Sequence, residues 1–367
     1  MAYFQSSFNI LMRPYLSFLI LLLLAGCNQP LDFTSAEPII PKEETSSVQS
    51  SDIKVNAKER ACSNHIRGLQ LLNDMQGWAS GAGGTVLRMT DGEHWEVFEV
   101  PGYSHLDFRD IHGFDEMTAL AMAAGEEGRI IHTEDGGQTW TEVYTNLEDG
   151  IFLDGIDFDG DIGYCIGDPM DGKALILRSI DAGRSWSPVD PETIATAIPR
   201  EGSYAASGTT VVSKEGMTYA AYGGDSLIRV LKNKGELQGW TSIQAPLRIG
   251  EGCGIFSLAF KNEQEGVAVG GCYIDSLSSE GNCAVISDAG ETWTPIKRST
   301  PSGYRSCVVY APSSDFYLTC GRTGIDFSND NGLAWDPVST DGYYTCSLAD
   351  STGWLMGRNG RMAKVKW

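Results

Sequence analysis

Short apolar stretches separated by glycine and acidic residues dominate the chain after residue 60. Four of them share a pattern of small and apolar residues bounded by glycine or alanine: Gly77–Gly81, Ala119–Ala123, Gly163–Gly167 and Gly266–Gly270. Apolar runs of this length between turn-forming residues are typical of β-strands. No amphipathic stretch long enough for a major helix follows residue 70, so the pattern predicts an all-β domain.

A second motif, Ser/Thr-x-Asp-x-Gly-x-Thr-Trp, recurs downstream of these strands. Clear copies span 133–140, 179–186 and 328–335, and further copies end at Trp95, Trp240 and Trp293 with some positions lost. The six tryptophans are therefore at 95, 140, 186, 240, 293 and 335, spaced 45, 46, 54, 53 and 42 residues apart. A repeat of this length predicts one four-stranded propeller blade per copy.

The aspartate and tryptophan of each copy are expected to be structural rather than catalytic. The aspartate carboxylate can accept hydrogen bonds from turn N–H groups, and glycine supplies a positive φ between two strands. The tryptophan buries a large apolar surface in its own blade or the next. We assign this role to Asp91, Asp135, Asp181, Asp288, Asp330, Trp95, Trp140, Trp186, Trp293 and Trp335.

The chain ends one strand short of a complete last blade. After Trp335 it offers three candidate strands, at 343–349, 353–357 and 362–367. Residues 52–62 precede the first blade, and we expect them to supply the missing strand and cover the last free sheet edge. The prediction is a seven-bladed β-propeller of four-stranded blades over residues 53–367, closed by an N-terminal strand. A six-bladed ring with a C-terminal appendage is the alternative.

Residues 1–26 have the features of a lipoprotein signal peptide. Arg13 precedes the apolar run Tyr15–Leu24, which at about ten residues is too short to span a bilayer. The sequence Leu24-Ala25-Gly26-Cys27 resembles the lipobox of bacterial lipoproteins, in which the equivalent of Cys27 is lipidated. An ordinary signal peptide that happens to end in cysteine is the alternative.

Residues 27–52 are rich in proline, serine and threonine and lack an apolar period, which predicts a flexible tether from the lipidated Cys27. Asn28, rather than aspartate, follows the cysteine, a feature that resembles outer-membrane sorting in Gram-negative lipoproteins. We therefore expect a lipid-anchored protein of the bacterial cell envelope, located at the outer membrane.

The charge balance narrows the possible partners. The chain has 27 Lys and Arg against 48 Asp and Glu, a net charge of −21. Nucleic-acid binding is disfavoured because phosphate neutralisation requires a basic surface. We expect a monomer without a cofactor.

Eight cysteines remain besides Cys27, and an even number in an exported chain favours disulfides. The best single guess at a pairing is Cys272–Cys283, with Cys307–Cys320 as a weaker guess. The chain has no Cys-x-x-Cys motif and only five scattered histidines, so we do not expect a metal site.

The chain resembles the BNR/Asp-box propellers, and among them the photosystem II stability/assembly factor-like family. General features of the resemblance are the Asp boxes and the Gly-Trp-x-x-Gly pairs. More specific ones are the segments Ile166–Pro169, Glu201–Thr209 and Glu265–Gly271. Photosynthetic members of this family act as assembly factors that bind a protein partner, so the resemblance implies a binding role. It also implies that Asp-box turns lie at the periphery, away from the functional mouth of the ring.

A binding site is expected where the innermost strands begin, at the mouth of the central channel. Aligning these strand starts by eye places seven residues at equivalent positions: Arg67, Arg109, Asp154, Ser207, Phe256, Arg305 and Tyr344. Arg67, Arg109 and Arg305 predict an anion-binding mouth, because the guanidinium fork suits carboxylate or phosphate. Asp154, Asp168 and Glu201 would be nearby acids. The alternative is a structural ring of buried Arg–Asp pairs, with Asp110 and Asp154 as the local partners.

Two classes of function are compatible with these features. We favour a non-catalytic binding scaffold for a protein or glycan. The alternative is a sialidase-like glycoside hydrolase acting at the mouth, because three arginines also form the carboxylate-binding triad of sialidases. Sialidases carry an early Arg-Ile-Pro phrase as well, which this chain lacks, and a tyrosine nucleophile paired with an acid, a role that the sequence does not assign to Tyr344.

Overall fold

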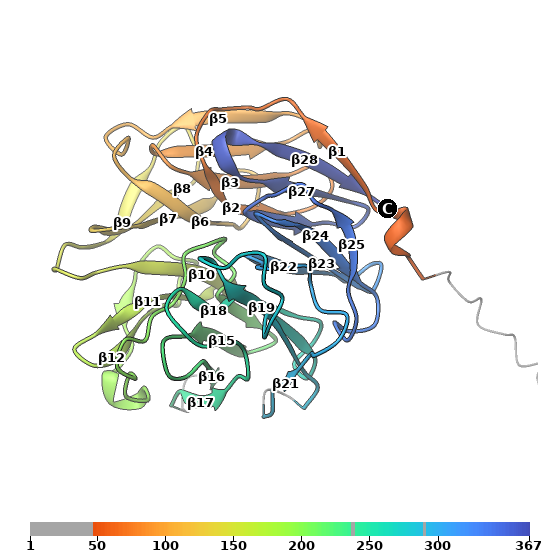
Figure 1. The fold of residues 1–367 in the computed structure, drawn as a ribbon. Helices are drawn as coiled ribbons and strands as arrows, with labels where there is room; N and C mark the ends of the chain where they lie inside the picture. The colour runs from red at the N-terminus through yellow and green to blue at the C-terminus, as the bar shows by residue number, and fades with distance from the viewer. Residues whose placement is uncertain (1–46, 236–238, 289–290) are drawn as a thin grey trace, which may run out of the picture. The chain divides into compact units, whose positions relative to one another are not determined.

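The computed structural model describes residues 47–235, 239–288 and 291–367. Their strands form seven antiparallel sheets of four strands each, so the predicted seven-bladed propeller is confirmed (Figure 1). Within these residues the only helical segments are three short 3₁₀ turns, η1 (Ser50–Asp52), η2 (Pro191–Thr193) and η3 (Arg358–Gly360).

Each blade is a simple meander in chain order, listed from its innermost strand outwards. The first three blades are β2 (Ile66–Leu71), β3 (Gly77–Gly81), β4 (Thr85–Met89), β5 (Trp95–Glu99); β6 (Asp107–Gly113), β7 (Ala119–Ala124), β8 (Gly128–Thr133), β9 (Thr141–Asn146); and β10 (Leu153–Asp159), β11 (Ile162–Met170), β12 (Lys173–Ser179), β13 (Ser187–Pro188). The next three are β14 (Val211–Lys214), β15 (Met217–Tyr222), β16 (Arg229–Lys234), β17 (Thr241–Gln244); β18 (Cys253–Phe260), β19 (Gly266–Cys272), β20 (Cys283–Ile286), β21 (Thr294–Pro295); and β22 (Cys307–Ala311), β23 (Phe316–Gly321), β24 (Gly324–Ser328), β25 (Asp336–Ser339).

Blade 7 draws its strands from both ends of the described chain. Its inner strands are β26 (Thr345–Leu348), β27 (Thr352–Met356) and β28 (Met362–Lys366), and β1 (Lys54–Lys58) adds the fourth. β1 pairs with β28 antiparallel, from Lys54 opposite Lys366 to Lys58 opposite Met362. The closing strand predicted from residues 52–62 is therefore confirmed.

An ion-pair cluster ties this closing strand to the first blade. Glu93, in the turn before β5, contacts Lys58 of β1 and Lys364 of β28 at 2.8 Å each. The hydrogen bonds from these two lysines lower the pKa of Glu93 from 4.5 to about 2. The carboxylate therefore stays ionised across the physiological range and links blades 1 and 7.

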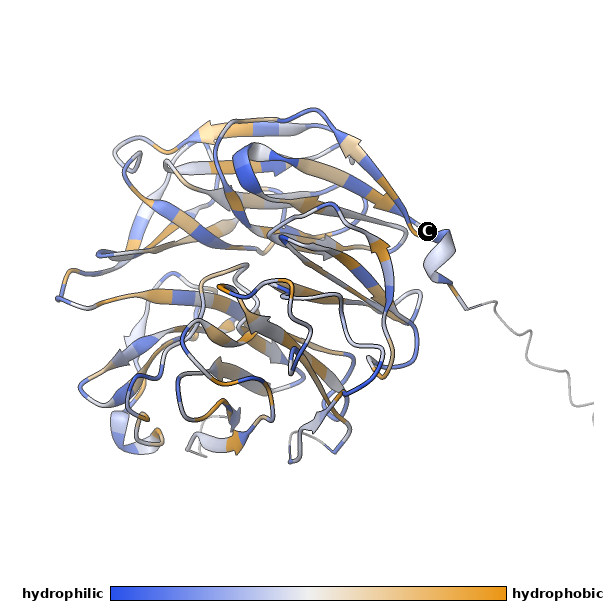
Figure 2. Cartoon of the chain, in the orientation of Figure 1, coloured by the Kyte–Doolittle hydropathy of each residue, from blue (hydrophilic) through white to orange (hydrophobic). Residues whose placement is uncertain are grey.

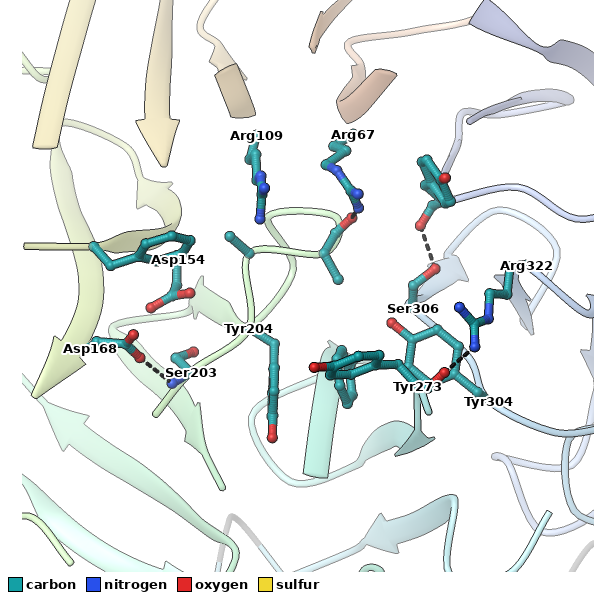
Figure 3. A pocket seen from close by; sticks show the side chains of 15 residues that line it. Arg67, Arg109, Asp154, Asp168, Ser203, Tyr204, Tyr273, Tyr304, Ser306 and Arg322 are labelled. Carbon is teal, nitrogen blue, oxygen red and sulfur yellow. Dashed lines mark hydrogen bonds between the residues drawn. The ribbon is translucent and has the colours of Figure 1, made fainter. Parts of the chain in front are cut away.

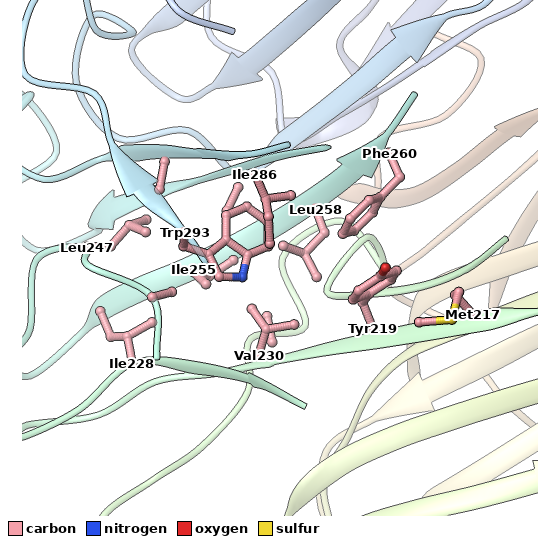
Figure 4. Close-up of a cluster of buried hydrophobic side chains, with 14 residues drawn as sticks. Met217, Tyr219, Ile228, Val230, Leu247, Ile255, Leu258, Phe260, Ile286 and Trp293 are labelled. Atoms are coloured by element: carbon pink, nitrogen blue, oxygen red, sulfur yellow. The ribbon is translucent and has the colours of Figure 1, made fainter. Parts of the chain in front are cut away.

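The hydrophobic core is divided into interfaces between neighbouring blades. Seven of the buried clusters each join two adjacent blades, and together they run once around the ring. In the interface of blades 4 and 5, Tyr219 stacks on Phe260 with ring centroids 4.0 Å apart (Figure 4). Apolar and polar residues are interspersed along the strands (Figure 2).

The Asp-box tryptophans fill these interfaces on the side of the preceding blade. Trp95 meets Trp354 of blade 7 edge-on at 5.6 Å between ring centroids, and Trp140 meets Trp78 of blade 1 at 6.5 Å. Trp367, at the end of the chain, packs at the interface of blades 6 and 7, which lacks an Asp-box tryptophan. The repeat thus supplies one indole for each of the other six interfaces, with Trp240 included.

The Asp boxes connect the third and fourth strands of their blades, as predicted. In the turn between β8 and β9, Asp135 accepts hydrogen bonds from Thr133 Oγ1 and from the backbone N–H of Thr139, both at 2.9 Å. The indole N–H of Trp140 donates to the Gly137 carbonyl at 3.2 Å. The acceptor role recurs at Asp91, Asp181, Asp288 and Asp330.

The disulfide differs from the two predicted pairings. Cys253 and Cys272 form a disulfide, because they are direct partners on β18 and β19. The pairing Cys272–Cys283 is wrong, since Cys283 begins β20 and lies opposite Val269. Cys307 lies opposite Cys320 on β22 and β23, but both are free thiols, so that pairing is wrong as well.

The segment before β1 contacts blade 6. Asn329 Nδ2 donates to the Val48 carbonyl at 2.9 Å, and Ser50 Oγ donates to Asp336 at 3.2 Å. The predicted signal peptide, Cys27 and most of the predicted tether lie outside the described residues. Within the described ranges, the structure contains no helix with the length and apolar character needed to cross a membrane.

Candidate functional site

In four of the seven blades a β-bulge directs one residue toward the mouth of the ring. The innermost strands of blades 1, 2, 3 and 5 each contain a register shift, which skips Arg67, Arg109, Asp154 and Phe256 respectively. A bulge leaves one residue unpaired and re-aims its side chain. All four of these side chains line one cavity of about 450 Å³. The alignment of strand starts is thus correct in these four blades.

In blade 6 the sequence alignment is one residue out of register. Three glycines of the second strands, Gly81, Gly167 and Gly270, face the carbonyls of His65, Phe152 and Gly254. In each case the residue aimed at the mouth follows that carbonyl by two positions. Gly321 faces the Tyr304 carbonyl in the same way, so the equivalent residue in blade 6 is Ser306. A one-residue slip turns a strand's side chains to the opposite face, so Arg305 points away from the cavity.

Arg305 and Glu201 each belong to a buried ion pair and do not line the cavity. Arg305 Nε donates to Asp326 at 2.6 Å, and both side chains are fully buried. Glu201 pairs with Arg229 at 2.6 Å, also with little exposure. Asp110 is buried too, but it accepts hydrogen bonds from the backbone of Ile111 and Ile156. The structural alternative of buried Arg–acid pairs therefore describes Arg305. Arg109 also pairs with an acid, Asp107, but at a partly exposed position, and Arg67 forms no ion pair in the described residues.

The other predicted residues, Arg67, Arg109, Asp154, Asp168 and Tyr344, share the cavity (Figure 3). Blade 4 contributes the loop Ser203–Ala206 rather than Ser207, which is buried and bonded to the Ser306 carbonyl. The cavity also contains residues that the sequence pattern did not single out: Phe152, Tyr273, Tyr304, Ser306 and Arg322. The sequence could have indicated Arg322. It directly follows Gly321 of β23, just as the predicted site residue Asp168 directly follows the equivalent Gly167 of β11.

One wall of the cavity is basic. Arg109 Nε donates to Asp107 at 2.8 Å, whereas the contacts of the Arg67 guanidinium among the described residues are the Ala206 carbonyl at 3.4 Å and the Tyr344 ring at 4.5 Å. Arg67 Nε is buried and has no hydrogen-bond partner within the described residues. Burial, followed by the nearby charge of Arg109, lowers the pKa of Arg67. This wall therefore holds a mostly buried cation without a carboxylate partner.

The neighbouring wall, formed by blade 3, is acidic. Asp168 accepts one hydrogen bond, from the Ser203 backbone N–H at 3.0 Å. The side chain of Asp154 is fully buried, and neither of its oxygens accepts a hydrogen bond of normal geometry in the described part of the chain, although the Ala205 N–H is close enough to lower its pKa. Burial raises the pKa of both carboxyl groups, and the negative charge of Asp168 raises that of Asp154 further.

Aromatic rings form the remainder of the lining. Tyr204 stacks on Phe256 with ring centroids 3.9 Å apart, and Tyr304 meets Phe256 edge-on at 4.8 Å. The Tyr204 hydroxyl donates to the Cys253 carbonyl at 2.8 Å, so the disulfide lies directly behind this wall. The cavity thus combines two walls of opposite charge with a rigid apolar surface, an arrangement suited to binding an organic ligand.

No metal centre accompanies this cavity in the ranges that the structure describes. Nowhere among those residues do three or more histidine, cysteine or acidic side chains gather in a way that could hold a metal ion.

Comparison with known proteins supports the family resemblance over part of the chain. Residues 89–201 match the family model described as Photosynthesis system II assembly factor YCF48. None of the curated proteins shows significant sequence similarity to the chain.

Solved structures with the same fold have diverse functions. YCF48 bound to D1 peptide has a TM-score of 0.62 and 15% identity, covering 85% of this chain and 95% of that one. Virginiamycin B lyase from Staphylococcus aureus has a TM-score of 0.61 and 13% identity, covering 86% and 99%. The GH74 enzyme of Niastella koreensis has a TM-score of 0.57 and 12% identity, covering 84% and 53%. At these identities the likeness establishes the fold alone.

Proposed function

We propose, taking the YCF48 family match of residues 89–201 as the premise, that this chain is a non-catalytic binding propeller that recognises a carboxylate of a protein partner at the mouth of its ring. The observation that carries the proposal is Arg67, a mostly buried guanidinium beside Arg109 that forms no ion pair in the described residues, although Asp107 is near enough to raise its pKa. An unpaired buried charge is costly, and a ligand carboxylate would supply the missing partner.

A protein ligand is favoured over a glycan. The related YCF48 structure contains a D1 peptide, so a propeller of this fold binds a polypeptide segment. The cavity of about 450 Å³ has room for a few amino-acid residues but not for a folded domain. A chain end or an exposed acidic side chain of the partner therefore fits it best.

The binding prediction concerns the two arginines. A random octapeptide library with free C-termini should yield peptides that bind the wild-type protein. Their affinity should fall about 10- to 100-fold in Arg67→Ala and in Arg109→Ala, because each substitution removes a charged hydrogen bond. Fluorescence polarisation with the selected peptides measures this loss. Arg184→Ala is the control, since Arg184 pairs with Glu134 on the exposed Asp-box surface. Unchanged affinity in both arginine variants, with their folds intact, would refute the carboxylate site.

The hydrolase alternative is favoured by one observation, the pair of carboxyl groups Asp154 and Asp168. A glycosidase, however, keeps one carboxylate ionised while the pKa of the other is raised. Here burial raises the pKa of both carboxyl groups, and no ion pair within the described residues favours the ionised form of Asp168. Tyr344 lies under the Arg67 guanidinium, whereas a sialidase nucleophile needs an adjacent acid. Turnover of fluorogenic glycosides that disappears in Asp168→Asn would establish the hydrolase instead.

We also propose that the domain is held in the bacterial cell envelope by a lipid on Cys27. The lipobox-like sequence before Cys27 and the proline- and serine-rich segment after it support this location. Labelling cells with radioactive palmitate should mark the wild-type protein but not Cys27→Ala. Equal labelling of both would contradict the anchor.

A further inference from the structure

The acidic wall of the mouth cavity has no cationic partner. Neither Asp154 nor Asp168 takes part in an ion pair within the described residues. The charge of Arg109 lowers the pKa of Asp154, but Arg109 Nε already donates a hydrogen bond to Asp107. Arg67, on the same wall as Arg109, contacts the Ala206 carbonyl and the Tyr344 ring instead.

Asp154 is the stronger indication of a missing ligand. Buried polar groups are almost always hydrogen-bonded, and leaving a buried carboxyl group without a partner costs stability. Both oxygens of Asp154 are without a partner in the part of the chain described here, although the residue lines the cavity. Asp168, beside it, is more accessible and uses one oxygen to accept the Ser203 N–H bond. Figure 3 shows the two carboxyl groups together on one side of the cavity, next to Arg109 and farther from Arg67.

We propose that the cavity binds a ligand carrying a cationic amine as well as a carboxylate, with the amine on Asp168 and Asp154 and the carboxylate on Arg67 and Arg109. This inference rests on the proposed carboxylate recognition and adds the second charge. The aromatic surface of Tyr204 and Phe256 lines the same cavity and suits the hydrocarbon part that joins the two groups.

The test uses ω-amino acids of increasing length, which differ in the distance between the amine and the carboxylate. The probes are 4-aminobutanoate, 6-aminohexanoate and 8-aminooctanoate, each compared by calorimetry with the fatty acid of the same length. At the best-fitting length, the amino acid should bind at least about tenfold tighter than its fatty acid, because the amine gains a charged hydrogen bond. The preference should fall to about one in Asp168→Asn and in Asp154→Asn. It should persist in Glu134→Gln, which removes an exposed acid distant from the mouth.

The outcomes separate this inference from the proposed function. If the amino acids and fatty acids bind wild type equally, and both are lost in Arg67→Ala, the amine site is refuted while carboxylate recognition stands. If neither class of probe nor any library peptide binds wild type, the proposed function fails and the inference fails with it. Asp168 is only partly buried, so Asp168→Asn keeps the test valid if Asp154→Asn does not fold.

A second arm identifies the source of the two charges. Acetyl-Gly-Lys-Gly and acetyl-Gly-norleucine-Gly share a free C-terminus and differ only in the lysine ammonium. A preference of about tenfold or more for the lysine peptide supports the amine site and indicates a peptide segment as the ligand. A preference found with the ω-amino acids alone supports the amine site and indicates a small free zwitterion.

Discussion

Replacing Arg305 with alanine is expected to lower the free energy of unfolding by about 3–5 kcal/mol, because it leaves the Asp326 carboxylate buried and unpaired. Arg305 donates to Asp326 at 2.6 Å, to Thr323 Oγ1 at 2.7 Å and to the Tyr304 carbonyl at 2.9 Å. These contacts join the loop before β22 to the turn between β23 and β24. Urea titration followed by tryptophan fluorescence measures the change.

Two further variants make this prediction specific. Arg305→Met combined with Asp326→Leu should recover most of the lost stability, because replacing a whole buried ion pair by apolar groups is often close to neutral. Arg184→Ala breaks an exposed pair with Glu134 and should change the free energy of unfolding by less than about 0.5 kcal/mol. A loss below about 1 kcal/mol in Arg305→Ala would show that Asp326 finds another partner or takes up a proton at little cost.

Removing the closing strand is the second change with a large expected effect. A chain that starts at Glu59 lacks β1 and should be less stable than one that starts at Ser46. Ile53, next to β1, is 6% exposed and packs into the interface of blades 6 and 7. Truncating such a side chain to alanine alone costs about 2–5 kcal/mol. The full deletion also frees the outer edge of β28 and breaks the contact of Lys58 with Glu93.

Thermal unfolding and light scattering distinguish the two architectures considered for this chain. In the closed seven-bladed ring, the shorter chain should melt at a lower temperature and aggregate, because β28 presents an unpaired edge. Ile53→Ala should reproduce part of the loss, whereas Lys54→Ala, on the exposed side of the same segment, should not. Equal melting temperatures of the two chains would mean that β1 does not hold the ring together.

Much of the fold could be predicted because its signal is local and repeated. The Asp boxes marked six of the seven blades and gave their length, since each turn needs an aspartate acceptor, a glycine with positive φ and a buried indole within eight residues. The three strands after Trp335 and the unassigned segment near Ile53 then indicated how the ring closes. The disulfide could not be predicted in the same way, because Cys253 and Cys272 meet through the β18–β19 register, which local spacing does not reveal.

The candidate site was only partly predictable. Arg67, Arg109 and Asp154 could be predicted because a bulge recurs at the start of their strands. Residues at equivalent positions of the sequence repeat therefore lie at equivalent positions around the ring. The same alignment placed Arg305 at the mouth, although its side chain is buried against Asp326. A single residue of register decides whether an arginine faces a ligand or the core, and the sequence pattern around Arg305 is compatible with both.

The amino-acid sequence alone determined the all-β class, the seven blades, the closing strand and the structural role of the Asp boxes, because each depends on contacts within one repeat or on its periodic recurrence. Only the tertiary structure decided which charged residues face one another. It separated the paired Arg305 and Glu201 from the unpaired Arg67 and Asp154, and it brought Arg322 and Tyr273 to the same cavity. Charge pairing around the ring depends on contacts between residues that are far apart in the sequence, and the local sequence pattern does not predict these contacts.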